Sequence, residues 1–189
     1  MKEIEVKILN IEPEVMKNKL LALGAVKVKD EKQINMIFDT KDFYLDNSSN
    51  GYARIRVTED TLNNRQEKTF TLKKNITTDG VRENTEYNME LTDDEKMVQI
   101  LFGLGYELKH TGKKHRTSYE FDGILFEIDI WDNDTYPFPY MEIEVNKEED
   151  INRAIKMLDI DKCNVTTKSI QQLRKELEIG NDRNKKNGV

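Results

Sequence analysis

Two pairs of acidic residues, each with its members two positions apart, stand out as groups that can do chemistry. Glu3 and Glu5 lie in Glu-Ile-Glu-Val-Lys, which ends at Lys7, and Glu142 and Glu144 lie in Met-Glu-Ile-Glu-Val. In a β-strand, residues two apart share one face and lie roughly 7 Å from each other. Two carboxylates at that spacing can converge on one hard cation such as Mg²⁺, which keeps several of its waters. Taken alone, the first stretch is better explained as an ordinary strand with its charged face in water.

The same alternation of apolar and charged residues recurs along the chain. On the charged face we find Glu3, Glu5, Lys7, Arg54, Arg56, Lys73, Glu86, Lys114, Arg116, Asp129, Glu142 and Glu144. In an open sheet these residues would form cross-strand ion pairs in water, each worth a fraction of a kcal/mol. In a closed barrel with helices outside they would line the bore, and eight strands can enclose a small ligand. The pattern alone favours neither arrangement.

The elements that would position these residues form two similar halves, each reading strand, helix, strand, strand, strand. Pro13 opens the first helix, and a Thr92/Glu95 capping box opens the second. Thr166 or Thr167 is a candidate cap for a last helix. Asp122-Gly123 predicts a two-residue hairpin turn. Strands are predicted near 3–8, 33–39, 52–57, 70–73, 86–91, 113–121, 124–131 and 141–145, a further helix near 149–158, loops at 46–51 and 77–82, and a polar connection at 60–67.

Composition narrows the class of protein. The chain has 189 residues, 37% hydrophobic and 35% charged, and a net charge of −6, which argues against a general nucleic-acid binder. No apolar run has the length of a membrane span, and no signal-peptide pattern is present, so we expect no membrane association. The single cysteine, Cys163, excludes an internal disulfide, predicts a cytoplasmic protein and is expected to be a small buried hydrophobe. With two histidines, His110 in an expected loop and His115 facing outward, zinc is disfavoured; carboxylates would instead hold Mg²⁺ or Mn²⁺.

From Glu3 to about Leu177, the sequence resembles the CYTH superfamily, the triphosphate tunnel metalloenzymes. The resemblance rests on motifs in a characteristic order: Glu3-Ile-Glu5-Val-Lys7, Phe38-Asp39-Thr40, Arg54-Ile55-Arg56, Leu72-Lys73, Lys114-His115-Arg116, Phe126-Glu127-Ile128-Asp129, Tyr140-Met141-Glu142-Ile143-Glu144 and Thr167-Lys168-Ser169. It implies an α+β fold, an eight-stranded antiparallel closed tunnel with helices packed on its outside. Such a tunnel holds a triphosphate and one or two divalent metals.

The resemblance also implies roles for individual residues. Substrate binding falls to the basic residues Lys7, Arg54, Arg56, Lys73, Lys114, Arg116 and Lys168. Metal binding falls to the acidic residues Glu3, Glu5, Asp129, Glu142 and Glu144, and the central catalytic group would be Glu3, Glu5, Lys7 and Asp129. Two departures weaken parts of the match. Asn88 follows Glu86-Tyr87 where the family often has a second Glu, which makes Glu86 a less secure ligand, and Ile170 replaces a frequent Tyr. Glu127 shares a face with Asp129, but the family pattern supports Asp129 better.

The family contains class IV adenylate cyclases, thiamine triphosphatases and inorganic triphosphatases. We favour a triphosphatase, because hydrolysis requires only that the triphosphate be gripped, and no purine or thiazole pocket is evident. Trp131 is expected to pack at the tunnel rim rather than stack on a ring of the substrate. A class IV adenylate cyclase, a triphosphate or polyphosphate sensor without turnover, and an interaction module with solvated charges remain the alternatives. We expect one domain over residues 1–179 and a disordered tail over 180–189, and no heptad pattern specifies an oligomeric state.

Overall fold

The computed structural model describes the backbone of residues 2–75 and 82–177 and the side chains of residues 4–74 and 85–177. Most of the expected loop at 77–82 and the whole of the expected tail at 180–189 lie outside the described residues. The elements in chain order are β1 Lys2–Ile8, α1 Pro13–Ala22, β2 Val26–Thr40, α2 Tyr44–Ser49, β3 Tyr52–Asp60, β4 Arg65–Asn75, β5 Arg82–Glu90, α3 Asp94–Gly103, β6 Tyr106–Phe121, β7 Ile124–Trp131, β8 Tyr140–Val145, α4 Glu149–Met157, a 3₁₀ turn Lys162–Asn164, β9 Val165–Thr166 and α5 Ile170–Glu176.

The strands form one antiparallel sheet. In the described part of the chain it has nine strands in the order β5-β4-β3-β2-β6-β7-β8-β1-β9. The ninth, β9, is two residues long and was not predicted; it adds to the free edge of β1, with Thr166 opposite Lys7. At its other end β1 also pairs with β5, with Glu5 opposite Arg82. The predicted α+β class, its two similar halves and its antiparallel sheet are confirmed, whereas closure of the sheet into a tunnel stays a prediction.

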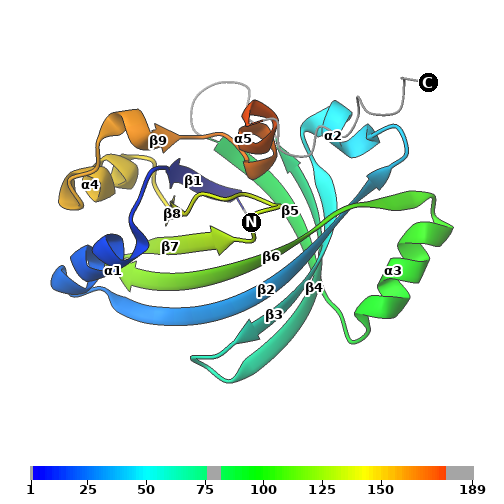
Figure 1. Ribbon diagram of the computed structural model, residues 1–189, viewed down its shortest axis with the longest axis horizontal. Coiled ribbons are helices and arrows are strands. Elements are labelled where there is room, and N and C mark those ends of the chain that lie inside the picture. The colour runs from blue at the N-terminus through cyan, green and yellow to red at the C-terminus, as the bar shows by residue number, and fades with distance from the viewer. Residues whose placement is uncertain (1, 76–81, 178–189) are drawn as a thin grey trace.

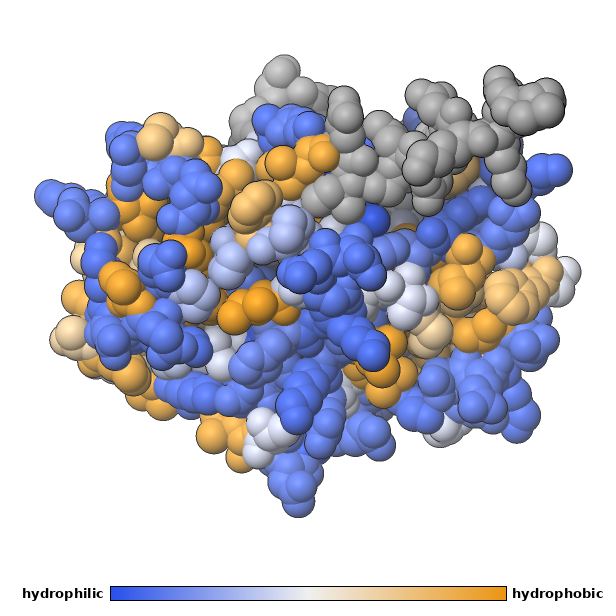
Figure 2. Space-filling model, in the orientation of Figure 1, coloured by the Kyte–Doolittle hydropathy of each residue, from blue (hydrophilic) through white to orange (hydrophobic). Residues whose placement is uncertain are grey.

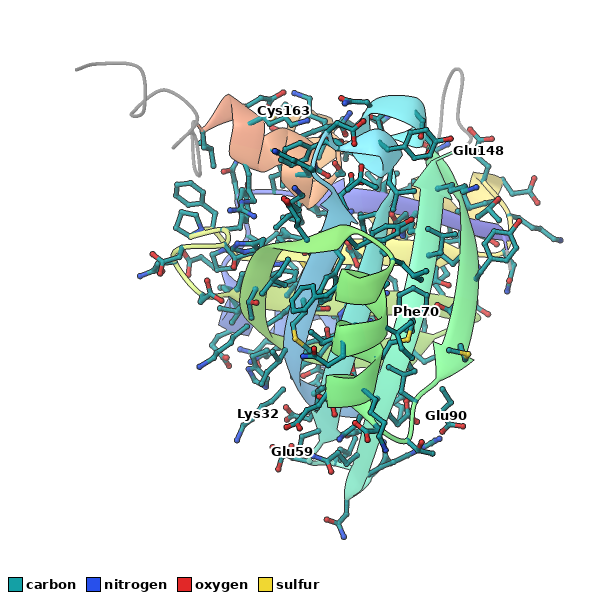
Figure 3. All side chains as sticks on the ribbon, turned by 90° about the vertical axis from the view of Figure 1, so that its right-hand side faces the viewer. Lys32, Glu59, Phe70, Glu90, Glu148 and Cys163 are labelled. Atoms are coloured by element: carbon teal, nitrogen blue, oxygen red, sulfur yellow. The ribbon has the colours of Figure 1, made fainter. Side chains whose placement is uncertain are left out.

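The apolar face of the sheet is covered by helices in two separate places (Figure 1). Alternate residues of β1, β7 and β8, such as Ile128 and Ile143, pack with α1 and α4, and Leu20 of α1 is fully buried there. At the other end of the sheet, α3 packs on β2, β3 and β4 through residues such as Phe38 and Leu101. Figure 3 shows α3 lying across these strands beside Phe70 of β4. The hydrophobic cores therefore lie outside the curve of the sheet.

A third, smaller cluster lies where α5 meets the loop between β7 and β8. Tyr136, Tyr140 and Leu173 are buried in it, and Trp131 packs against them. The Trp131 indole Nε1 donates a hydrogen bond of 2.8 Å to the Tyr140 hydroxyl. Trp131 therefore has a packing role in this cluster, as the sequence predicted.

The surface between the two outer cores is mostly hydrophilic. In Figure 2, apolar side chains gather over the α1 and α4 side and over the α3 side, with polar and charged side chains between them. Among the described residues, no helix combines the length and the apolar character needed to cross a membrane.

Two expected connections are more regular than predicted. The expected loop at 46–51 is mostly helix α2, because the buried Asp39 carboxylate, at the end of β2, accepts hydrogen bonds from the backbone N–H groups of Leu45 and Asp46. The expected polar connection at 60–67 is a four-residue turn between β3 and β4. Asp60 stabilises it by accepting from the N–H groups of Leu62 and Asn63.

The predicted helix caps are wrong by one to three residues. Asp93, rather than Thr92, caps α3 and accepts from the N–H of Lys96. Ser169, rather than Thr166 or Thr167, caps α5 and forms a capping box with Gln172. The intervening residues 165–166 are instead recruited into β9.

Three further predictions have different outcomes. The Asp122-Gly123 turn is confirmed, and both residues have the positive φ that a tight hairpin of this kind requires. His110 lies within β6, so its loop assignment is wrong, whereas His115 is exposed as predicted. Cys163 is exposed on the 3₁₀ turn (Figure 3), so its expected burial is wrong.

Candidate functional site

The charged face of the sheet is turned away from bulk water. Lys7 is 4% exposed, Lys114 5% and Asp129 0%, and the Glu5 and Glu142 side chains are 12% and 13% exposed. The alternate residues of the same strands form the outer hydrophobic cores, so these charges lie on the inner, concave face. The alternative in which these charges lie in bulk water is therefore wrong, whether or not the sheet is closed.

The inner face of β1, β7 and β8 forms a wall rich in carboxylates, which we call the acidic wall. It is made up of Glu5, Glu127, Asp129, Glu142 and Glu144. Pairing of β7 with β8 places Glu127 opposite Glu142, and pairing of β1 with β8 places Glu5 opposite Glu144. Like charges directly opposite each other in a sheet are destabilising, so this wall requires nearby cations.

Arg116 of β6 supplies one of these cations and binds three of the carboxylates. Its Nε and one terminal N–H group donate to the two oxygens of Asp129 at 2.6 and 2.7 Å. The same terminal nitrogen reaches Glu142 at 2.6 Å, and the other contacts Glu127. In this structure the Arg116 guanidinium neutralises the acidic wall; its predicted role in binding phosphate stays a prediction.

Two lysines complete this network. The Lys7 Nζ lies 2.8 Å from Glu142 and 3.8 Å from Glu5. The Lys114 Nζ donates to the second oxygen of Asp129 at 2.9 Å. Both oxygens of Glu142 and both oxygens of Asp129 therefore face cations of the protein itself.

Burial and these partners determine the protonation states. Burial alone would raise the pKa of Glu142, but Lys7 and Arg116 outweigh it and hold that pKa well below its usual value. Burial raises the pKa of Glu127, because Arg116 offsets it only in part. Burial, and after it the charge of Arg116, lowers the pKa of Lys114 to about 8. Burial therefore makes the charged form of Lys114 less favourable than that of a lysine in water.

The inner face of β3 differs from the acidic wall, because its two arginines have no acidic partner among the described side chains. Among the described residues, no carboxylate lies within ion-pair distance of Arg54 or Arg56. Toward the described residues, Arg54 donates one long hydrogen bond, 3.3 Å to Thr71, and its Nε has no partner. Arg56 donates from Nε to Asn35 at 2.8 Å. Burial, followed by the charges of Arg54 and Arg116, lowers the pKa of Arg56 to about 10.

Lys73 and Glu86 face each other on β4 and β5. The Lys73 Nζ lies 2.5 Å from the Glu86 carboxylate, which is 9% exposed. Burial alone would raise the pKa of Glu86, but Lys73 outweighs it and lowers that pKa. Glu86 therefore serves as an ion-pair partner of Lys73 in this structure.

The structure brings together most of the predicted site residues. Lys7, Arg54, Arg56, Lys73, Lys114 and Arg116 share the inner face with Glu5, Glu86, Glu127, Asp129, Glu142 and Glu144. Lys168 is not among them, because its side chain is 48% exposed and pairs with Glu176 of α5 at 2.6 Å. Glu3 lies on β1 opposite Asn84, and its side chain is outside the described set.

The carboxylates suit a hard divalent cation in type, and one pair suits it in position. Asp129 and Glu142 already bind Lys7, Lys114 and Arg116, and among the described side chains no three acidic, histidine or cysteine groups form a ready-made metal cluster. Glu5 and Glu144 are largely buried and directly opposite each other on β1 and β8, so their side chains leave neighbouring points of the same face. A site with two carboxylates completed by water and substrate oxygens is the kind that Mg²⁺ takes.

Sequence reasoning missed two polar residues on the inner face. Gln33 and Asn35 of β2 are 3% and 2% exposed. We selected residues by charge, and these two are neutral. The period-2 pattern that runs through Glu31, Gln33 and Asn35 would have placed them beside the charged residues.

The fold and its buried, charge-lined inner face can be compared with known proteins. A family model for the CYTH domain matches residues 1–170, and the chain belongs to this family.

The sequence search among curated proteins gives no match, but solved structures give several. PH1012 from Pyrococcus horikoshii OT3 is 24% identical, covers 90% of this chain and 98% of its own, and superposes with a TM-score of 0.74. A protein from Vibrio parahaemolyticus, described as a candidate adenylate cyclase, is 14% identical over 92% of this chain and 97% of its own, with a TM-score of 0.70. HpAC1 from Hippeastrum, described as having a dominant triphosphatase activity, is 19% identical over 84% of this chain and 88% of its own, with a TM-score of 0.62. At these identities the likeness is one of fold.

Proposed function

We propose that this chain is a metal-dependent triphosphatase, which binds a triphosphate against the inner face of the sheet and releases phosphate. The observation that carries the proposal is the pair Arg54 and Arg56, largely buried side by side without an acidic partner among the described residues. A buried charge without a partner is costly, so such a pair is retained where an anion will bind it. A triphosphate, with about four negative charges near neutral pH, is an anion of the right kind.

The basic residues on the inner face of β3 and β4 and the acidic wall would have different roles. Arg54, Arg56 and Lys73 would bind phosphoryl oxygens, the arginines through planar pairs of N–H groups and the lysine as a point charge. Lys114 on β6 lies between the two sides and Lys7 on β1 lies within the acidic wall, and each would turn from its carboxylate to the substrate. Arg116 would keep Glu127, Asp129 and Glu142 charged and in place, and can share its N–H groups with a bound phosphate.

Glu5 and Glu144, with Glu3 as a further candidate, would hold Mg²⁺ or Mn²⁺. A bound divalent ion supplies charge stabilisation at a phosphoryl oxygen and a water of lowered pKa. The remaining contributions come from positioning, because phosphoryl transfer needs its charge stabilised and its groups aligned more than it needs covalent chemistry. Hydrolysis is favoured over cyclisation because it requires a grip on the triphosphate alone. The triphosphatase activity described for HpAC1, a protein of the same fold, supports this choice.

We further propose that the sheet closes around the substrate. The pairing of β1 with β5 joins two strands that are otherwise distant in the strand order, and its residues include Glu3 and Glu5. Closure at this place would surround the triphosphate by protein on all sides of the bore, which strengthens every charge interaction within it.

The test is to incubate the protein separately with tripolyphosphate, thiamine triphosphate and ATP, each with Mg²⁺ and with Mn²⁺, and to identify the products. Orthophosphate from tripolyphosphate, dependent on metal, is the expected result. Cyclic AMP with pyrophosphate from ATP would replace the proposal with a class IV cyclase. Micromolar binding of all three compounds without any turnover would replace it with a sensor.

A further inference from the structure

The inner face of β2 carries two buried amide side chains whose orientation can be assigned. The Arg56 Nε–H can only donate, so the Asn35 atom that meets it at 2.8 Å is the carbonyl oxygen. The Glu31 carboxylate, whose other oxygen lies 3.7 Å from the Lys29 Nζ, accepts a hydrogen bond of 2.6 Å from the Gln33 amide nitrogen. Asn35 is thereby left with a free donor, Nδ2, and Gln33 with a free acceptor, Oε1.

These free atoms are unusual because both residues are almost completely buried. Asn35 is 2% exposed, and its Nδ2 has no hydrogen-bond partner in the part of the chain that the structure describes. Most buried polar side-chain atoms in proteins have a partner, and each exception requires an explanation. A second buried donor without a partner, the Nε of Arg54, lies on the neighbouring strand. Asn35 is opposite Arg56, and Arg56 is two residues from Arg54 on the same face, so all three groups lie within the length of a triphosphate.

We infer that Asn35 is a substrate-binding residue whose Nδ2 donates a hydrogen bond to a phosphoryl oxygen held by Arg54 and Arg56. An ionised phosphoryl oxygen only accepts hydrogen bonds, so it satisfies the unpartnered donors of Asn35 and Arg54 together. Asn35 also fixes the plane of the Arg56 guanidinium through its carbonyl oxygen, leaving the terminal N–H groups of Arg56 for the same anion. The inference rests on the proposed function, because it adds a neutral donor to the triphosphate site.

Gln33 provides a matched contrast on the same strand face. Its free atom is an acceptor, which a phosphoryl oxygen cannot use, and its amide nitrogen is already occupied by Glu31. The two amides are equally buried and differ in the polarity of the unpartnered atom. Loss of the Gln33 amide is therefore expected to disturb the interior to a similar extent without removing a contact to phosphate.

The experiment is titration calorimetry with tripolyphosphate, in chelator, on the full-length chain and three variants. Asn35→Leu removes both amide groups and is expected to weaken binding by about tenfold or more, the loss typical of a hydrogen bond to a charged group. Asn35→Asp keeps an acceptor for Arg56 but loses the donor, and is expected to weaken binding at least as much. Gln33→Met is expected to stay within about twofold of the unaltered protein, a difference well below that of a charged hydrogen bond. Thermal melting of each variant establishes that it is folded.

Each outcome decides between the possibilities. If Asn35→Leu does not fold, Asn35→Asp carries the test alone. Equal weakening by Gln33→Met and Asn35→Leu would overturn the inference, because the effect would then be a general disturbance of the bore. Unchanged affinity in both Asn35 variants, with normal binding by the unaltered chain, would overturn the role of Asn35 and leave the proposed function intact. An unaltered chain that binds no tripolyphosphate would remove the proposed function and this inference together.

Discussion

Arg116 and Arg54 face the same interior, yet removal of their charges should have very unequal effects on stability. Arg116 binds Asp129 and Glu142 at 2.6–2.7 Å and contacts Glu127. Removing one partner of a buried ion pair typically costs 3–5 kcal/mol, because the remaining charge is left without compensation. We therefore expect Arg116→Met to lower the free energy of unfolding by about 3–5 kcal/mol. In a chain of this size that corresponds to a fall of roughly 6–20 °C in Tm.

Arg54→Met should be close to neutral for stability. Arg54 donates one hydrogen bond of 3.3 Å and has no carboxylate within ion-pair distance among the described residues. Its charge, second to burial, also lowers the pKa of Arg56 to about 10, so its removal relieves a repulsion. We expect the free energy of unfolding to change by less than about 1 kcal/mol, as for a substitution that breaks no strong contact. Tripolyphosphate binding should nevertheless weaken by about ten- to a hundredfold, the loss of one charge-assisted contact.

The two variants are compared by urea or thermal unfolding without ligand, in chelator, and by calorimetry with tripolyphosphate. Arg153→Met serves as the control, since Arg153 forms ion pairs with Asp122 and Asp150 at the surface. Such exposed pairs contribute about 0–1 kcal/mol. Equal destabilisation by Arg54→Met and Arg116→Met would refute the reasoning, because it would mean that Arg54 has a strong partner in the ligand-free protein.

Three further predictions concern metal, pH and backbone. Glu144→Ala should leave metal-free tripolyphosphate binding unchanged or stronger while turnover collapses, and added Mn²⁺ should recover part of the rate; a loss of metal-free affinity in calorimetry would contradict the metal role. Because the pKa of Lys114 is lowered to about 8 and a bound anion favours the charged form, metal-free affinity should fall as the pH rises above 8, by at most about tenfold per pH unit. Lys114→Arg should flatten this profile between pH 8 and pH 9.5, and a profile that keeps its slope in the variant would assign the titration to another group. Gly51→Ala should lower the free energy of unfolding by about 1–3 kcal/mol in urea, because a Cβ there would lie 2.5 Å from the backbone oxygen of Lys73. An unchanged unfolding midpoint would contradict this prediction and show that the backbone shifts here without loss of stability.

The alternation of side chains made the strands predictable but not the partners of the charges. A period of two places Arg116 on the inner face whatever the register, and this placement is correct. Which groups Arg116 meets depends on the register of three strands, with Arg116 opposite Asp129 and Glu127 opposite Glu142. No local pattern specifies that register, so the contacts of Arg116 with the protein's own carboxylates could not be predicted from the sequence, whereas its predicted contact with phosphate stays a prediction.

The missed helix α2 has a similar cause. Residues 46–50 are Asp-Asn-Ser-Ser-Asn, a composition typical of a loop, and the helix forms because Asp39 reaches it from the end of β2. A cap six and seven residues away falls outside the short motifs that mark helix starts. The positions of Asn35 and Gln33 on the inner face could have been predicted from the sequence. The alternation along the strand that places Phe38 on the outer face places both amide side chains on the inner face.

The placement of the hydrophobic cores on the convex side of the sheet has a consequence for how such a protein can diversify. Each strand contributes its odd or even positions to the cores under α1, α3 and α4 and the alternate positions to the concave interior. Selection for folding thus acts on the outward-facing positions of each strand, and selection for ligand recognition acts on the inward-facing positions. The two sets of side chains alternate along one backbone and lie on opposite faces of the sheet. A change such as Asn in place of an acidic residue at Asn88 alters what the interior presents, while the apolar contacts of the neighbouring positions on β4 remain. Lineages with this architecture can therefore exchange substrates by accumulating changes on one set, at little expense to the fold that the other set maintains.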